Sequence, residues 1–118
     1  MLWGGNVLVG GFSVGGAETK PVVVRALGPS LAEQNVANAL ADPLLEVHDS
    51  DGNLLQTNDN WGQGPDAQMI QAEGFAPTKA KEAALQATLG PGNYTVVVSG
   101  VNGTSGIALV EIYDYSPL

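Results

Sequence analysis

Short runs of β-forming residues, separated by turn-forming residues, recur along almost the whole chain and constrain its fold more than any other feature. Gly, Pro, Asn and Asp end the runs, and no long helical segment lies between one run and the next. Seven strands at this spacing predict an all-β fold, an antiparallel β-sandwich of about seven strands, and argue against alternating strands and helices. The predicted strands are 6–14, 21–27, 43–49, 53–57, 82–89, 94–99 and 106–114.

Three breaks between strands have the composition of turns. Segment 50–53 contains Asp-Gly, which predicts a tight hairpin turn because glycine readily adopts the positive φ that such a turn needs. Segment 90–93 predicts a second turn, and segment 101–106 predicts a third that joins the last two strands as an antiparallel pair. Segments 29–40 and 65–73 interrupt the strand pattern and are predicted to form short helical caps over the ends of the sandwich.

Length and charge limit the class of protein. The 118 residues predict a single module over 1–118, and twelve acidic residues against four basic ones give a net charge of −8. This charge argues against nucleic acid as a partner and against binding to anionic membranes. No apolar stretch approaches the roughly 20 residues of a membrane helix, so no membrane insertion is expected. The absence of cysteine excludes disulfides and thiol chemistry.

Three of the predicted strands are apolar on both faces: 21–26, 95–99 and 108–113. The outer face of a two-layer sandwich is normally polar where it meets water. Either the irregular segments of the same chain cover these faces, or another molecule does.

The N-terminal tail, 1–5, is a second indication of contact with another surface. Met1, Leu2 and Trp3 are apolar and precede a Gly-Gly hinge. We expect this tail to pack against an edge strand of its own chain, a neighbouring chain or a crystal neighbour, which makes these three residues candidates for assembly. The first residues lack the features of a secretory signal, which is compatible with a cytosolic protein or with one module of a longer secreted chain.

Several motifs in order resemble a repeat module that occurs, often in tandem, in large secreted or surface-bound bacterial proteins. They are Arg-Ala-Leu-Gly-Pro-Ser-Leu at 25–31, Leu-Ala-Asp-Pro at 40–43, Asn-Asp-Asn-Trp at 58–61 and the closing strand at 106–114. The second half is also loosely similar to bacterial pre-peptidase C-terminal domains, through an Asp-rich hairpin followed by Gly-Asn-Tyr-Thr-Val at 92–96. The resemblance implies a non-catalytic module located outside the cell or on its surface, and it implies no particular ligand.

No catalytic constellation is apparent, so the chain is not expected to be an enzyme. His48 is the single histidine, and neither a Gly-x-Ser-x-Gly elbow nor a phosphate-binding glycine loop is present. Asp49, Asp51 and Asn53 stand at alternate positions, as in the first half of a calcium-binding loop, although the glycine among them is misplaced for an EF-hand. Ca²⁺ is therefore the one candidate cofactor, and an ordinary hairpin turn is the alternative.

Two groups of residues are candidates for ligand binding. Trp61 follows Asn58, Asp59 and Asn60, an arrangement that could stack a sugar ring while amides and carboxylates bind its hydroxyls. The alternative is a tryptophan that plugs one end of the sandwich.

Tyr113 and Tyr115 share one face of the last strand and form a second candidate platform, with packing at the rim as the alternative.

Two functions follow from these features. The first is a structural or assembly module that associates with itself or with neighbouring modules. The second is a carbohydrate-binding module with glycans as partners, and exposure of the aromatic side chains would favour it.

Overall fold

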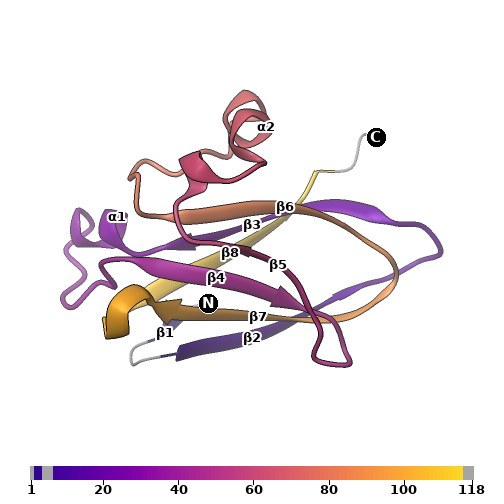
Figure 1. Ribbon diagram of the computed structural model, residues 1–118, viewed down its shortest axis with the longest axis horizontal. Coiled ribbons are helices and arrows are strands. Elements are labelled where there is room, and N and C mark those ends of the chain that lie inside the picture. Colours follow the sequence, from indigo (N-terminus) through magenta and orange to yellow (C-terminus); the bar gives the residue numbers. More distant parts are fainter. Residues whose placement is uncertain (1, 4–6, 116–118) are drawn as a thin grey trace.

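The computed structural model describes residues 2–3 and 7–115 and arranges them as two packed antiparallel sheets (Figure 1). The prediction of an all-β antiparallel sandwich is confirmed. Sheet A has the order β1-β8-β3-β6, with β1 at Leu2–Trp3, β8 at Ala108–Asp114, β3 at Lys20–Leu27 and β6 at Ala83–Leu89. Sheet B has the order β2-β7-β4-β5, with β2 at Val7–Val14, β7 at Gly92–Gly100, β4 at Pro43–His48 and β5 at Leu54–Asn58.

The core lies between the sheets and is formed by the alternate residues that each strand turns inward. In β4, for example, Leu45 and Val47 are buried while their neighbours Glu46 and His48 are only partly covered. The same alternation governs β7, where Val96 and Val98 are buried. The other fully buried apolar side chains of this core include Val24, Ala26, Ala83 and Leu85. Each of the seven predicted strands matches an observed strand to within two residues at either end.

One predicted pairing is wrong. The turn after β7 was expected to join β7 and β8 as an antiparallel pair, but β7 pairs with β2 and β4 while β8 pairs with β1 and β3. The connecting segment is hydrogen bonded to segment 38–42: Val101 N donates to Asp42 O, and Ile107 N donates to Asn38 O. These bonds hold the connecting segment where the chain crosses from sheet B to sheet A. The hairpin between β4 and β5 forms as predicted, with Gly52 at a φ of 83°.

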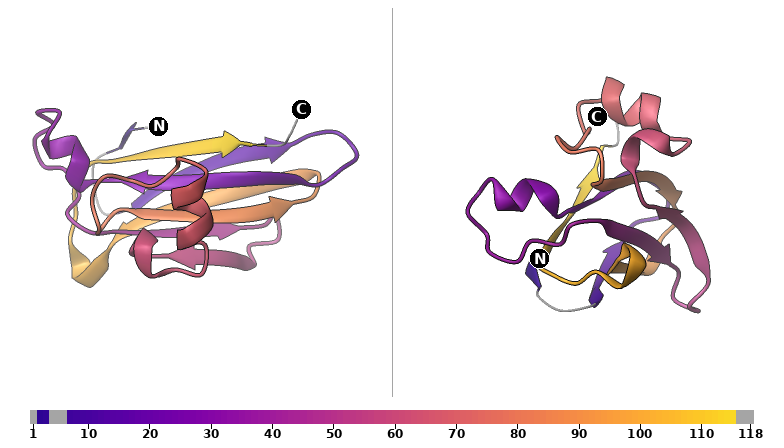
Figure 2. Two further views of the ribbon diagram at one scale, coloured as in Figure 1. Left: turned by 90° about the horizontal axis from the view of Figure 1, so that it is seen from above. Right: turned by 60° about the vertical axis from the view of Figure 1, so that its left-hand side comes forward.

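The helices are short. They are α1 at Pro29–Ala32, the 3₁₀ turns η1 at Trp61–Gln63 and η2 at Val101–Gly103, and α2 at Ala67–Ala72. Helix α1 lies at one end of the sandwich, as expected. Helix α2 differs from the expected end cap, because it lies over sheet A, on the opposite side of the molecule from β2 (Figures 1 and 2). No helix in residues 2–3 and 7–115 is long and apolar enough to cross a membrane.

The two outer faces differ. Sheet A is covered by its own chain: Ile70 of α2 is fully buried, and the ring of Phe75, in the loop after α2, packs on Tyr113 of β8. Within residues 2–3 and 7–115, no segment covers sheet B in this way, and Val9 and Leu54 remain 58% and 52% exposed on its surface. Of the two explanations for strands that are apolar on both faces, cover by the same chain is the one observed for sheet A.

Candidate functional site

Trp61 lies in η1, at the start of the segment that covers sheet A. Its backbone N donates to Glu82 O at 2.9 Å, which joins η1 to the residue just before β6. Its side chain is half-buried and borders a hollow of about 410 Å³ together with Asn60, Gln63 and Thr78. The indole is therefore neither a free platform nor a full plug, since part of it faces a polar hollow.

The neighbouring Asn58 stabilises the fold rather than facing this hollow. It is 8% exposed, its Oδ1 accepts from Ala84 N at 3.1 Å, and its Nδ2 donates to Asn60 O at 3.3 Å. Both ends of the amide are thus bonded to backbone. Of the four residues predicted as a sugar site, Asn60 and Trp61 line the hollow and Asn58 does not. Binding itself stays a prediction.

Asp59 meets an acidic partner that the sequence did not reveal. One oxygen, Oδ1, of Asp59 and one of Asp42 are buried and find no donor. Burial raises the pKa of Asp59, and so do a hydrogen bond and charge repulsion from the Asp42 carboxyl, while the Lys81 ammonium acts in the opposite direction. Two carboxyl groups can hydrogen bond each other only when one is protonated, so this pair holds a shared proton most readily in acid.

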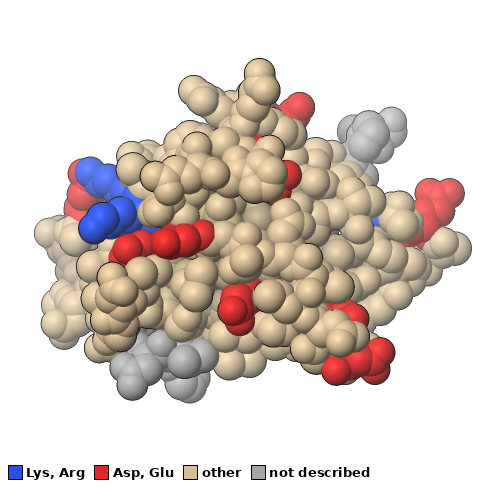
Figure 3. Space-filling view, in the orientation of Figure 1, with Lys and Arg blue, Asp and Glu red and all other residues tan. Residues whose placement is uncertain are grey.

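The basic side chains in Figure 3 gather mainly at the end of the sandwich near α1, beside acidic ones.

Tyr113 and Tyr115 are brought together, but under another ring. Phe75 lies over both, with ring centroids 5.1 Å from Tyr113 and 5.8 Å from Tyr115. The Arg25 guanidinium stands 5.6 Å from the Tyr113 ring centroid and also binds the Glu111 carboxylate, with 2.9 Å from Nε to Oε1. Burial raises the pKa of both tyrosines. These contacts resemble rim packing, and ligand binding at the two tyrosines stays a prediction.

The predicted calcium residues form a turn in which both carboxylate oxygens of Asp49 already accept hydrogen bonds. Asp49 Oδ1 accepts from the backbone N of Asp51 and of Asn53, each at 2.9 Å, and Asp49 Oδ2 accepts from Asn53 Nδ2 at 3.1 Å. The hydrogen bonds from Asn53 and Asp51 lower the pKa of Asp49. In the described part of the chain, no three His, Cys, Asp or Glu side chains cluster closely enough to hold a metal. Calcium binding stays a prediction, and an ion here would have to compete with these bonds.

The single histidine is paired with a carboxylate on the outer face of sheet B. His48 Nε2 lies 3.1 Å from Glu46 Oε1, and His48 Nδ1 lies 3.3 Å from Gly52 O. The hydrogen bond to Glu46 and then the one to Gly52 raise the pKa of His48. Both ring nitrogens are therefore engaged within the hairpin.

Glu82 is a buried acid that sequence reasoning missed. It is 0% exposed, and its Oε2 accepts from the backbone N of Gly28 at 3.0 Å and from the backbone N and hydroxyl of Ser30 at 2.9 and 2.5 Å. Its Oε1 accepts from Lys79 N at 3.3 Å. The carboxylate thus ties the start of α1 to the end of the segment that covers sheet A. No local pattern in the sequence marks it, because the partners in α1 are more than 50 residues away.

The described part of the N-terminal tail pairs within its own chain. Leu2 lies opposite Leu109 and Trp3 opposite Ala108 in the β1–β8 ladder. Met1 and residues 4–5 of the predicted tail lie outside the described residues. The role of the tail in assembly stays a prediction.

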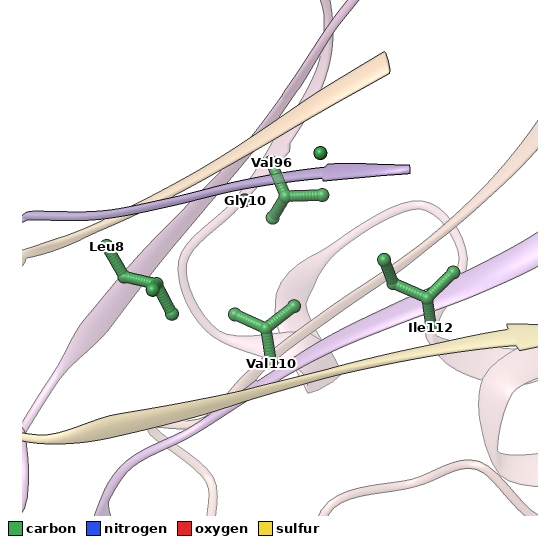
Figure 4. A pocket seen from close by; sticks show the side chains of 6 residues that line it. Leu8, Gly10, Val96, Val110 and Ile112 are labelled. Carbon is green, nitrogen blue, oxygen red and sulfur yellow. The ribbon is translucent and has the colours of Figure 1, made fainter. Parts of the chain in front are cut away.

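The side of the sandwich between β2 and β8 contains a second hollow, which was not among the sites expected from the sequence. It measures about 210 Å³ and is lined by Leu8, Gly10, Val96, Val110 and Ile112 (Figure 4). The side chains of Leu8, Val110 and Ile112 point toward one another across it (Figure 4). Gly10 stands at an inward position of β2 and adds no side chain to the lining. The Gly-Gly pair inside a predicted strand was the available signal.

Comparisons with known proteins bear on the fold. No family model matches the sequence, and no curated protein matches it. A solved structure, the pre-peptidase C-terminal domain of a collagenase from Bacillus anthracis, superposes with a TM-score of 0.56 over 96% of this chain and 88% of that one, at 12% identity. At 12% identity, the comparison supports similarity of the fold and nothing further. The chain therefore has a fold similar to that of a pre-peptidase C-terminal domain, as the resemblance in its second half implied.

Proposed function

We propose that this chain is a non-catalytic structural module of a bacterial protein outside the cell or on its surface, and that it associates with copies of itself or with neighbouring modules. The observation that carries the proposal is the difference between the two outer faces. Segment 61–82 covers sheet A, and no segment in the described part of the chain covers sheet B in the same way.

The uncovered face has the chemistry of a contact surface. Val9 at 58%, Leu54 at 52% and Leu55 at 44% exposure belong to sheet B, and Val97 of β7 is half-buried in the middle of the same sheet. These residues stand on β2 and β5, the two edge strands of sheet B, and Val97 lies between them, so we take them as candidates for contact with another molecule. Residues 83–110 contain no charged side chain, so β7 in the middle of this sheet carries none.

The test is the mass of the protein in solution, measured by light scattering across a wide concentration range. The proposal expects a mass that rises above the 12.1 kDa of the single chain as concentration increases. A mass of 12.1 kDa at every concentration contradicts self-association. The single chain is sufficient for this measurement, because it already carries the uncovered face.

The second candidate function is carbohydrate binding, which the hollow beside Trp61 favours. Its lining combines a half-buried indole with the amides of Asn60 and Gln63 and the hydroxyl of Thr78, groups that stack on and hydrogen bond to sugars. A glycan array with the native chain, Trp61→Ala and Trp61→Phe tests it. Binding by the native chain and by the phenylalanine variant, but not by the alanine variant, is expected. Equal signals from all three proteins would remove this candidate.

A further inference from the structure

We infer that β2 is the assembly strand of this module, and that the β2 strand of a second copy pairs with it in antiparallel orientation to join two copies of sheet B into one continuous sheet. The inference rests on the proposed function, and it names the β2 edge of sheet B, rather than the outer face of the sheet, as the surface through which association occurs.

The opposite side of the sandwich shows how this chain closes an edge. On β6, the backbone N of Ala84 donates to Asn58 Oδ1 and that of Gln86 donates to Asp66 Oδ2, each at 3.1 Å. Gln56 of β5 donates from Nε2 to the same Asp66 oxygen at 2.7 Å. Side chains therefore occupy the edge groups of β6 and bridge the two sheets there.

The β2 edge has none of these protections. Among the described residues, β7 is the only strand that pairs with β2, and no side chain caps its other edge. The strand is eight residues long and contains neither proline nor a charged side chain. Natural proteins usually protect an exposed edge strand with lysine, proline, a bulge or a very short length. A strand edge of this length, without proline or charge, is suited to pairing with another strand.

The strand also offers a site and a side chain that would fill it. Gly10 lines the 210 Å³ hollow between the sheets without a side chain, and Phe12 stands two residues further on the same inward face, packed on Tyr94 at a centroid distance of 5.5 Å. An aromatic residue placed across from an edge glycine compensates for the missing side chain. A second copy can supply this residue to the first, and the first to the second.

Symmetry restricts the register. A two-fold axis perpendicular to a continuous sheet keeps each face of the sheet on the same side. Because side chains alternate along a strand, inward residues must therefore pair with inward residues and outward ones with outward ones. The register with Gly11 on the axis meets this condition. It places Phe12 of each copy opposite Gly10 of the other, and Val9 opposite Ser13.

Charge permits a second copy at this edge. The chain carries a net charge of −8, which opposes contact between two copies over most of the surface. Neither β2 nor its partner β7 contains a charged residue, so two copies can meet along β2 without facing like charges. An interface made mainly of one strand pair is small, and its association should depend strongly on concentration.

The first experiment uses the absence of native cysteine. Gly11→Cys is compatible with the fold, because a Cβ at this position meets its nearest atom, Tyr94 O, at 3.6 Å. In the inferred register the two introduced thiols face each other across the axis, and mild oxidation should give a covalent dimer. Thr88→Cys, which is exposed on the opposite edge strand β6, is the matched control and should remain monomeric. Rapid cross-linking of T88C with none for G11C would overturn the inference.

The second experiment separates the β2 edge from the rest of the sheet B surface. Val9→Lys puts a charge on the edge strand, and Leu54→Lys puts the same charge on β5, at the other edge of sheet B and at similar exposure. The inference expects V9K to be monomeric at concentrations where L54K and the native chain associate. Equal loss in both variants would assign the contact to the sheet face instead of the edge. Native association without G11C cross-linking overturns the inference but leaves the assembly function intact, whereas a native chain that is monomeric throughout removes both.

Discussion

The outer faces of the two sheets are built from similar strands but end in different environments. In sheet A, Val23 and Ala84 point away from the core and are still buried, because the segment with α2 and Phe75 lies over them. In sheet B, the corresponding outward positions include Val9 and Leu54, which face solvent. A single covering segment therefore decides which face of this small sandwich is buried and which is available for contact.

The largest expected effect comes from removing the anchor of the cover. Ile70→Ala should lower the free energy of unfolding by about 2 to 5 kcal/mol, because Ile70 is 0% exposed and its truncation leaves a cavity under α2. The matched control on the open face, Leu54→Ala, should change it by about 0.5 kcal/mol or less. Chemical denaturation followed by circular dichroism measures both. Similar losses in the two variants would mean that the faces do not differ as described.

The second prediction concerns the tie between the cover and α1. Glu82→Gln keeps the shape of the side chain but replaces the carboxylate that accepts hydrogen bonds from Gly28 and Ser30. The substitution should lower the free energy of unfolding by about 1 to 3 kcal/mol. Glu33→Gln, which breaks an exposed ion pair with Lys79, should cost less than about 1 kcal/mol. The same denaturation assay applies. A larger loss for E33Q than for E82Q contradicts the role given to Glu82.

The third prediction uses the carboxyl pair at the start of the covering segment. Because the folded-state pKa of Asp59 is raised, the folded protein binds a proton more tightly than the unfolded chain. The stabilisation from this pair is therefore present in acid and is lost as pH rises through the folded-state pKa. In Asp59→Asn, the side-chain amide can donate to Asp42 at any pH. We expect the melting temperature of D59N minus that of the native chain to fall as pH decreases from about 7 to about 4, a window that approaches the usual pKa of an aspartate. A difference that stays constant over this range contradicts the shared proton.

The smallest effect is expected on the open face. The raised pKa of His48 means that its protonated form, paired with Glu46, adds stability below pH 6.5, and this contribution is lost as pH rises through the folded-state pKa. An NMR titration should give a His48 pKa above the usual 6.5 in the native chain and a lower value in Glu46→Gln. Identical pKa values in the two proteins would show that Glu46 does not hold the imidazolium.

The strand positions followed from the sequence because period-two alternation and turn residues are local signals. The hairpin at 50–53 was predicted for the same reason. The separation of β7 and β8 into different sheets was not predictable in this way. A glycine-rich turn shows that the chain reverses, but whether it stays in one sheet depends on its bonds to residues 38–42, which are distant in sequence.

The candidate sites were harder to predict than the strands. Trp61 and Asn60 do border a hollow, but the burial of Asn58 comes with its bond to Ala84, 26 residues away. The pairing of Asp42 with Asp59 and the burial of Glu82 likewise join residues that no short motif connects. A carboxylate in the sequence is only a charge, and its role depends on the donors that folding brings to it.

The fold class, the strand boundaries and the acidic charge follow from the sequence, because each depends on residue type and local spacing. The folded chain determines which apolar face is covered, which edge is closed by side chains and which two carboxyl groups meet. Those outcomes depend on contacts between distant segments, and the free energy of such contacts is set by geometry that no local pattern encodes.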